Sequence, residues 1–428
     1  YNAKKTIEDE LYSIENKLFP PSDNVVFHYD LTNTYFEGRA LRNTYGKHGK
    51  SKEKRTDCPL MSLSLAVRND GFPVYSCIYP GNQPEPITLK DMIKNVEALI
   101  AGPNAYDNQK TMFRPTFIMD RGIATKENVA LLQYEKFNYV VVKREDETKN
   151  YKDLFKNGRK TFDVVSEGHV SAYGDLNKVY VKKLEPVNNE RFCKVLCISD
   201  GKAQKQIAII TKKDSKLIKD FEDLNQAIKK GRIKNIDKIQ ARIGRIKARH
   251  KKSSEKYEVS LVIENEKALY VTWAKKPYYS CDESIYGRYV IETTFTKLDA
   301  IQIWILYMKQ TIVERTFRTM KHDLHIRPVF HQTKDRSSAH IFVTLLAYHL
   351  VITILNTLSE QGDKRSWATL RDILFTHCRV SLFHEDKVKG KAVNIRKSGV
   401  PEEEHLEIYK KLGITDYLKD VETVEYLD

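Results

Sequence analysis

The chain has 428 residues, enough for one large domain with insertions or for two to three domains. This length excludes the class of small proteins that cannot bury a sizeable hydrophobic core. Its 72 lysines and arginines outnumber its 57 aspartates and glutamates and leave a formal net charge of +15. Such an excess favours polyanionic partners, nucleic acid before acidic membrane surfaces. We therefore expect a soluble, globular protein with an anionic partner.

Cysteine usage and hydropathy bear on the cellular compartment. The six cysteines form neither a CxxC pair nor the spacing of a disulfide framework, which favours a reduced setting over a secreted one. The most apolar run, residues 341–355, contains Tyr348 and His349 and is shorter than the ~20 residues that span a bilayer. We expect a buried core helix at this run.

The first third of the chain predicts alternating strands and helices. The patterns indicate a helix over residues 6–18, a strand over 25–30, a hairpin of strands 62–68 and 72–79, a helix over 88–100, a strand over 115–120, a helix over 126–134 and a strand over 137–143. Two apolar strands end in a carboxylate, since Asp30 closes the strand at 25–30 and Asp120 closes the strand at 115–120. Each aspartate alone is more often a turn or cap residue.

From about residue 148 to 288 the pattern changes to short alternating segments. They predict strands over residues 178–184, 192–198, 205–211, 258–264, 268–274 and 288–294. Among them lies a basic helical stretch, whose apolar stripe consists of Leu217, Phe221, Leu224, Ile228, Ile236, Ile239, Ile243 and Ile246. Its other faces carry lysines and arginines, which either lie along DNA or form a solvated helix face. We expect a β-rich insertion with a basic helical arm.

The segment YMKQTIVERTFRTMK, residues 307–321, predicts one amphipathic helix. Tyr307, Gln310, Glu314, Arg318 and Lys321 recur on it at helical spacing and share one face. A single carboxylate therefore stands among bases, an amide and a phenol. The plain alternative is a solvated glutamate paired with a base one turn away.

Three carboxylates of these elements suit a two-metal site. Asp30, Asp120 and Glu314 are separated by about 90 and 190 residues, and hard Mg²⁺ or Mn²⁺ ions bind through a few such oxygens. Two ions ~4 Å apart activate the attacking oxygen and stabilise the leaving oxygen of a phosphoryl displacement. The order of elements is strand with Asp, hairpin, helix, strand with Asp, helix, strand and helix with Glu, which is the order of the ribonuclease-H-like fold.

Three segments of the chain resemble DDE transposases of bacterial insertion sequences, in the IS-four family. The signature of that family is Tyr, two residues, Arg, three residues, Glu, six residues and Lys. Tyr307, Glu314 and Lys321 match it in identity and spacing, while Gln310 stands in the Arg position. The segments YDLTNTYFEG (29–38) and FIMDRG (117–122) resemble those around the first and second catalytic aspartates. The resemblance covers about residues 25–145 and 285–355.

The resemblance implies an α/β fold with a ribonuclease-H-like catalytic core. In that core a mixed five-stranded sheet is flanked by helices, and a large β-rich insertion carries the basic helical arm. The expected boundaries are 1–22 for a helical lead-in, 23–147 and 288–360 for the two parts of the core, 148–287 for the insertion and 361–428 for a C-terminal region. The chain begins with Tyr1 rather than Met, so we expect it to be part of a longer protein.

The resemblance also implies catalytic roles and partners. Asp30, Asp120 and Glu314 would bind two Mg²⁺ or Mn²⁺ ions, and the enzyme would hydrolyse the phosphodiester at each element end and transfer the strand into target DNA. The implied partners are double-stranded DNA, both terminal repeats and target, and further copies of the chain in a homodimer or larger assembly. No membrane is implied, and the expected location is the bacterial cytoplasm, in association with the nucleoid.

The signature residues imply phosphate contacts. Tyr307 and Lys321 would contact the terminal DNA, as would Gln310 in the arginine position, although it lacks the charged fork of arginine. Lys309 or Arg318 are the candidates to supply the missing charge.

Two alternative functions are compatible with the same residues. A ribonuclease-H-like nuclease would cut without strand transfer, and a domesticated transposase would bind DNA without catalysis. Relatives that pass through a DNA hairpin hold a flipped base on an aromatic of the insertion. Trp273 or Tyr286 could have that role, although packing is favoured for both. Neither the terminal repeat nor the target preference follows from any motif.

Overall fold

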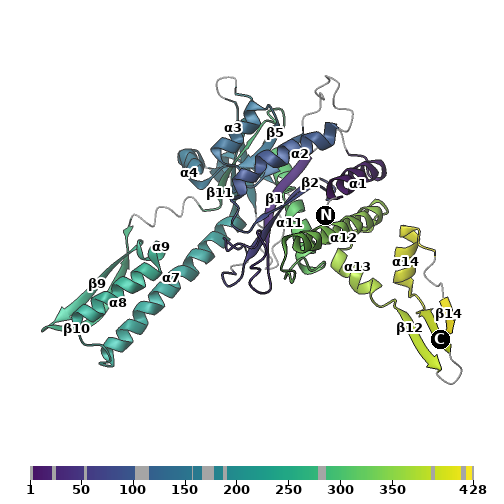
Figure 1. Ribbon diagram of the computed structural model, residues 1–428. Helices are drawn as coiled ribbons and strands as arrows, with labels where there is room; N and C mark the ends of the chain where they lie inside the picture. The colour runs from purple at the N-terminus through teal and green to yellow at the C-terminus, as the bar shows by residue number, and fades with distance from the viewer. Residues whose placement is uncertain are drawn as a thin grey trace. The chain divides into compact units, whose positions relative to one another are not determined.

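The computed structural model describes residues 3–21, 26–52, 55–101, 115–156, 158–165, 178–186, 190–277, 286–386, 391–415 and 421–426. They fold into two compact units (Figure 1), the first formed by residues 1–137 and 308–428 and the second by residues 138–307. This division differs from the expected insertion boundaries of 148 and 287, since strands that we assigned to the core flank the second unit at both ends. The domain boundaries stay a prediction.

Four strands of the first unit lie in the order β3-β2-β1-β4. They are β1 (Val26–Tyr35), β2 (Leu60–Arg68), β3 (Pro73–Pro80) and β4 (Thr116–Met119). β1 and β2 are antiparallel, as are β2 and β3, whereas β1 and β4 are parallel. The predicted hairpin is thus confirmed, and this mixed α/β arrangement is consistent with a ribonuclease-H-like transposase core.

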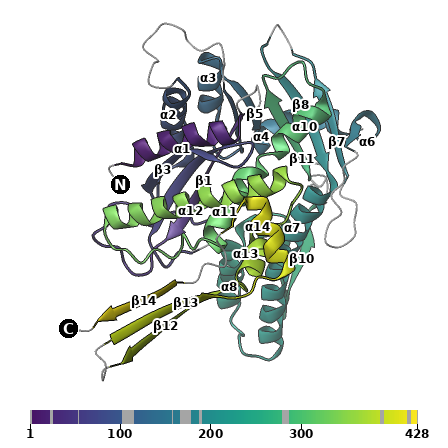
Figure 2. The same cartoon turned by 90° about the vertical axis from the view of Figure 1, so that its right-hand side faces the viewer.

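Helices cover both faces of these strands. Alternate residues of β2, among them Leu63 and Leu65, join a core with Phe317 of α11 (Thr311–His322) and Leu345 of α12 (Lys334–Glu360). Figure 2 shows α11 and α12 side by side along β1. The opposite face meets η1 (Glu85–Thr88) and α2 (Leu89–Ala101), where the Tyr29 hydroxyl donates to Thr88 Oγ1. Because both faces are covered, every residue of β2 is buried.

The predicted core helix corresponds to part of α12. Among the described residues, α12 is the one helix long and apolar enough to cross a membrane by length and composition. A core helix passes the same test, and the side chains of Ile341, Leu345, Tyr348 and Ile352 belong to the core of the first unit. Its packing therefore agrees with the expected core role.

The first unit contains further helices and three further strands. They are α1 (Lys4–Leu18), α3 (Lys126–Tyr134), α13 (Trp367–Leu374), β12 (Arg379–Asp386), β13 (Lys391–Ser398), α14 (Glu403–Leu412) and β14 (Val421–Tyr426). α1 and α3 confirm the helices expected at 6–18 and 126–134. His349 on α12 contacts the buried Glu15 carboxylate on α1, and β12, β13 and β14 form a separate antiparallel sheet.

The second unit contains antiparallel strands in the order β5-β11-β8-β7-β6. They are β5 (Asn138–Val142), β6 (Asp163–Val165), β7 (Val179–Leu184), β8 (Cys193–Ser199) and β11 (Arg288–Thr293). Its short helices are α4 (Glu145–Thr148), η2 (Lys149–Tyr151), α5 (Lys152–Phe155), α6 (Gly158–Thr161) and α10 (Ala300–Met308). The strands predicted near 137–143, 178–184, 192–198 and 288–294 are confirmed.

A helical arm extends from this unit and has its own core. It consists of α7 (Asp200–Lys229), α8 (Ile236–Arg249), α9 (Lys251–Ser254) and the hairpin β9 (Tyr257–Glu264) with β10 (Lys267–Lys275). The core contains Val271 and seven of the eight residues of the predicted stripe, namely Leu217, Phe221, Leu224, Ile228, Ile239, Ile243 and Ile246, whereas Ile236 is only partly buried and lies outside it. Trp273 stacks on Phe221 with ring centroids 5.6 Å apart. Trp273 therefore packs in the arm, as the sequence favoured.

Two sequence-based expectations about strands are wrong. Residues 205–211 lie inside α7, where Ile207 and Ile209 are exposed. The Ser199 side chain caps this helix by accepting from Lys202 N, and cooperative propagation over 30 residues overrides local strand propensity. The strand expected at 25–30 continues to Tyr35, so Asp30 lies in the middle of β1 rather than at its end.

The arm core gives a stability prediction. Replacing the fully buried Phe221 by Ala should destabilise the arm by about 3–5 kcal/mol, because a cavity forms beside Trp273. Hydrogen exchange should show lost protection in α7, α8 and β10 while α12 stays protected. Ile209→Ala, at an exposed position of the same helix, should change the free energy of unfolding by less than about 0.5 kcal/mol. Equal effects of the two substitutions would contradict the assigned core.

Candidate active site

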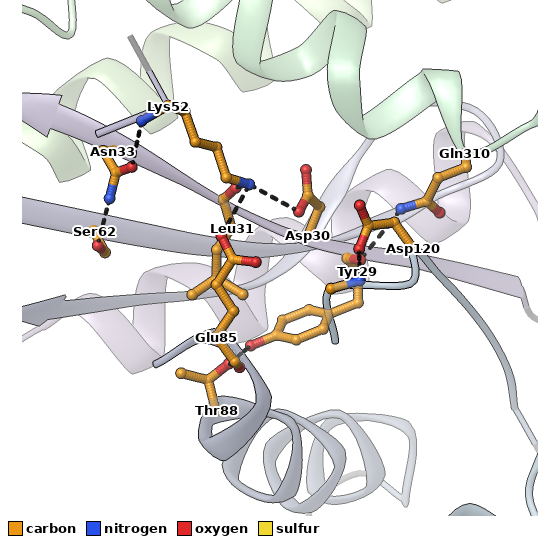
Figure 3. Close-up of polar contacts among 11 residues, drawn as sticks. Tyr29, Asp30, Leu31, Asn33, Lys52, Ser62, Glu85, Thr88, Asp120 and Gln310 are labelled. Carbon is orange, nitrogen blue, oxygen red and sulfur yellow. Dashed lines mark hydrogen bonds and ion pairs between the residues drawn. The ribbon is translucent and has the colours of Figure 1, made fainter. Parts of the chain in front are cut away.

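Strand register brings Asp30 and Asp120 together. β1 and β4 pair in parallel, and Tyr29 opposite Met119 is the last pair of their register. The next residue on each chain is Asp30 on β1 and Asp120 just after β4, and neighbouring strands lie about 4.8 Å apart. In Figure 3 the two carboxylates project to the same side. The structure therefore places the two predicted aspartates next to each other.

The face on which Asp30 lies is the one covered by α11. Asp30 pairs with Leu65, and paired residues of antiparallel strands point to the same face. Leu65 belongs to the core that contains Phe317 of α11. Four residues along β1, the Thr34 hydroxyl donates to the carbonyl of Ile326, 3.1 Å away, just beyond the end of α11. Asp30 thus projects toward the helix that carries Glu314.

A lysine and a glutamate complete the surroundings of Asp30 (Figure 3). Lys52 Nζ lies 3.3 Å from Asp30 Oδ1 and 3.2 Å from Glu85 Oε1, and it also donates to the carbonyl of Leu31. The backbone N–H of Lys52 donates to Asn33 Oδ1, 3.2 Å away, which fixes the lysine loop to β1. One ammonium therefore bridges two carboxylates and a carbonyl.

Asp120 and Glu85 meet at Gly122. The N–H of Gly122 donates to Asp120 Oδ1 at 2.5 Å. A Cβ at position 122 would stand 2.9 Å from that oxygen and 3.1 Å from Glu85 Oε2. A larger residue would push these two carboxylate groups aside, so the glycine allows both to approach the backbone here. Asp30, Asp120 and Glu85 consequently form one acidic cluster.

The pKa values of two residues in and near the acidic cluster are shifted. Burial raises the pKa of Asp30 to about 6; the negative charges of Asp120 and Glu85 add to the increase, while the Lys52 ammonium opposes it. Burial likewise lowers the pKa of Lys321 to about 8, and the positive charge of Lys52 lowers it further. A carboxylate and an ammonium with such shifts in one place are typical of functional sites, although structural ion pairs produce them too.

Glu314 lies on α11 between two contacts that join this helix to β1. At the start of α11, the Gln310 amide donates to the carbonyl of Tyr29, 3.3 Å away. Beyond its end, Ile326 accepts from Thr34. Glu314 follows Gln310 by about one turn and is exposed, so its backbone belongs to the stretch of α11 that runs along β1. Among the described residues, however, no three acidic, His or Cys side chains are close enough to hold a metal ion.

The helix expected over residues 307–321 is interrupted, which corrects the predicted stripe. α10 ends at Met308, and α11 begins at Thr311 after a turn at residues 309–310. Tyr307 belongs to the second unit, where its ring lies 6.4 Å from that of Tyr289. Gln310 is 7% exposed, and its amide donor is engaged on β1. The expectation of Gln310 on an open DNA-facing helix surface therefore does not agree with its burial.

The other candidates on α11 remain accessible. Arg318 is exposed and Lys321 is partly exposed, with Lys321 close enough to Asp30 and Lys52 for their charges to act on its pKa. His28, two residues before Asp30, is buried and contacts Asn69 Oδ1 at 2.8 Å. Burial lowers its pKa to about 4. His28 is therefore a core histidine whose neutral form is favoured by burial.

Sequence reasoning did not identify Lys52 or Glu85 as members of the site. Lys52 stands in the basic run KHGKSKEKR, where nothing distinguishes it from its neighbours. Glu85 lies between two prolines in QPEPIT, a context that predicts a turn. Only the fold brings η1 beside β1 and β4, so no local signal could have identified either residue.

A comparison with protein-family models gives an independent result. Residues 192–350 match the model of a transposase DDE domain. The matched part runs from β8 through the arm to α12 and includes Glu314, whereas Asp30 and Asp120 precede it. A search of curated proteins found no match. The match supports a DDE transposase, with DNA as the implied partner.

Proposed function

We propose that this protein is a DNA transposase of the IS-four type, which hydrolyses phosphodiesters at element ends and transfers the ends into target DNA. The observation that supports this most is the β1–β4 register, which sets Asp30 beside Asp120 under α11. The family match over residues 192–350 supports the same class of enzyme. Glu314 would be the third catalytic carboxylate.

The proposed donors suit divalent metal ions of the Mg²⁺ or Mn²⁺ class by their chemistry, although the described side chains do not gather closely enough to hold an ion in this structure. Carboxylate oxygens are the ligands these ions prefer, and the Lys52 ammonium shows that positive charge is stabilised between Asp30 and Glu85. Asp30, Asp120 and Glu314 would hold two ions. When bound, such ions supply activation of the attacking oxygen and charge stabilisation at the leaving oxygen.

The protein's own side chains would orient the substrate. Asp120 is held by the Gly122 N–H, and Asp30 is fixed within β1, so both carboxylates are positioned before DNA arrives. Lys321, which lies within the electrostatic range of Asp30, and the exposed Arg318 on the same helix would contact DNA phosphates. The reduced pKa of Lys321 reflects a partly buried ammonium, which a phosphate would stabilise.

The roles of the remaining signature residues differ within this proposal. Tyr307 would contact terminal DNA, as the resemblance implies. Gln310 would instead position α11, because its amide donates to the Tyr29 carbonyl. The assembly would be a homodimer or larger complex in the bacterial cytoplasm, because both ends of an element must be cut and joined together.

The catalytic assignment predicts the behaviour of three substitutions. Asp30→Asn, Asp120→Asn and Glu314→Gln should each lower cleavage of the element's terminal DNA by about a thousandfold or more, because metal-mediated charge stabilisation is worth several kcal/mol and ~1.4 kcal/mol is a factor of ten. DNA affinity, measured by fluorescence anisotropy, should fall far less. Glu37→Gln, which removes a carboxylate near β1 outside the acidic cluster, is the matched control.

A strand-transfer assay with the same variants distinguishes a transposase from a nuclease. A precut end with a free 3′-hydroxyl should be joined to a target plasmid by the unmodified protein and by Glu37→Gln, but not by Glu314→Gln. If the protein released only hydrolysed products, strand transfer would be excluded, and a ribonuclease-H-like nuclease would remain. Full activity of Glu314→Gln would refute the assignment of the third carboxylate.

Lys52 gives a prediction about metal binding that does not depend on activity. Lys52→Met removes the ammonium that bridges Asp30 and Glu85. Without this competing cation, Mn²⁺ should bind the DNA-free protein about threefold to tenfold more tightly, because each partly exposed ion pair is worth up to ~1 kcal/mol. Free Mn²⁺ followed by electron paramagnetic resonance measures this change. Weaker binding would show that Lys52 holds the carboxylates in place for the metal instead.

Gln310 and Lys321 occupy two positions of the signature, and we expect their substitutions to have different effects. Gln310→Met removes the hydrogen bond to Tyr29 and should lower the free energy of unfolding by about 1 kcal/mol, with DNA affinity unchanged within about twofold. Lys321→Met should leave folding intact and weaken DNA binding. Urea denaturation and anisotropy measure the two effects. A loss of affinity without a loss of stability in Gln310→Met would restore Gln310 as a DNA contact.

A further inference from the structure

The helix α8 is held rigidly in the arm by its apolar face. Ile239, Ile243 and Ile246 are buried in the arm core. The opposing helix α7 is fixed to β10 by Asn225, whose amide donates to the Val271 carbonyl at 2.9 Å and accepts from the Val271 N–H at 2.7 Å. The exposed side of α8 is thus presented in a fixed orientation within the arm.

That exposed side carries a stripe of positive charge. Lys238, Arg242, Arg245 and Arg249 recur every three or four residues, so they lie within about 60° around the helix. All four are exposed. Arg249 pairs with Asp220 at 3.0 Å, whereas the ion pairs found among the described residues include none with Lys238, Arg242 or Arg245. The arm itself therefore leaves most of this charge uncompensated.

Small residues border the basic stripe on the side away from the apolar face. Ala241, Gly244 and Ala248 are all exposed, and a Cβ at Gly244 would meet no atom within 4 Å. Glycine destabilises the interior of a helix. Among the described residues, no neighbouring element packs so closely against position 244 that a side chain would be excluded. The surface beside the cations is consequently flat from Ala241 to Ala248, so another molecule can approach the helix backbone closely there; the exposed Asp237 lies on the same side at the start of α8.

We infer that α8 is a docking surface for the sugar–phosphate backbone of duplex DNA. The inference rests on the proposed function for its choice of partner, since α8 lies within the part of the chain that matches the transposase DDE model. The major groove of duplex DNA, about 12 Å wide, admits an α-helix. The cations contact phosphates on one side while the small residues allow the helix to sink toward the groove.

The buried apolar face makes a membrane an unsuitable partner. An amphipathic helix on a lipid surface inserts its apolar side among acyl chains, but Ile239, Ile243 and Ile246 already face the arm core. The stripe consists of lysine and arginine alone, which contact phosphates without reading bases when they lie outside the groove floor. The α8 surface should therefore bind duplexes of any sequence.

The test uses the full chain with Glu314→Gln, so that DNA is bound without cleavage, and a duplex that lacks element ends. Arg242→Gln with Arg245→Gln should weaken binding at least tenfold near physiological salt. It should also reduce the slope of log affinity against log salt by about 2, because each lost phosphate contact contributes about 0.9. Lys229→Gln with Lys230→Gln, an equal charge change at the exposed end of α7, is the matched control and should change affinity less than threefold.

A second variant separates docking from general attraction by charge. Gly244→Leu alters no charge and fills open space, so hydrogen exchange should show an equally or more protected α8. Its bulk should nevertheless lower DNA affinity about tenfold. Unchanged affinity in Gly244→Leu, or equal losses in the two charge variants, would overturn the docking surface.

The choice of partner is tested with the same variants. Duplex RNA and vesicles containing phosphatidylserine are the competing probes. If either bound more tightly than duplex DNA, and depended as strongly on Arg242 and Arg245, the assignment to DNA would be wrong. Because binding is measured without cleavage, an inactive unmodified protein would refute the proposed function and leave this result standing.

Discussion

The candidate site depends on one constraint, the register of β1 between its two neighbours. Parallel pairing with β4 sets Asp30 beside Asp120, and antiparallel pairing with β2 turns Asp30 to the face covered by α11. A shift of one residue would turn Asp30 to the α2 face. The register is held by burial, since nearly all side chains around it, such as Tyr29 and Leu65, are fully enclosed. The chemistry of the site is therefore a consequence of core packing.

The burial that fixes the register also makes it less favourable, in free energy, for Asp30 to carry a negative charge. Asp30 loses solvent and gains Asp120 and Glu85 as like-charged neighbours, and its pKa rises to about 6. The protein offsets this repulsion with the Lys52 ammonium, which bridges Asp30 and Glu85. The carboxylates need a nearby cation to stay ionised, and the same negative charge attracts other cations. Lys52 and a divalent metal would therefore compete for the same carboxylate oxygens.

The sequence predicted those parts of the fold that depend on local patterns. The hairpin, the strand before Asp120, the helix at 126–134 and the arm's apolar stripe were each visible as periodicity, and the structure contains all of them. The predicted strand at 205–211 was wrong because the following helix propagated through it. Lys52 and Glu85 were missed because their proximity to Asp30 depends on contacts distant in sequence. Long-range placement, unlike periodicity, leaves no signal within a short window.

The interruption of the signature helix changes how Glu314 can act. A continuous helix would have carried Tyr307, Glu314 and Lys321 as one rigid stripe, but the turn at residues 309–310 separates α10 from α11. α11 is instead tied to β1 at both ends, through Gln310 with Tyr29 and through Thr34 with Ile326. These contacts restrain the helix, so the position of the Glu314 backbone along β1 is set by α11 and not by α10. Gln310 supplies this restraint through its amide donor, while its buried Oε1 has no hydrogen-bond partner among the described residues.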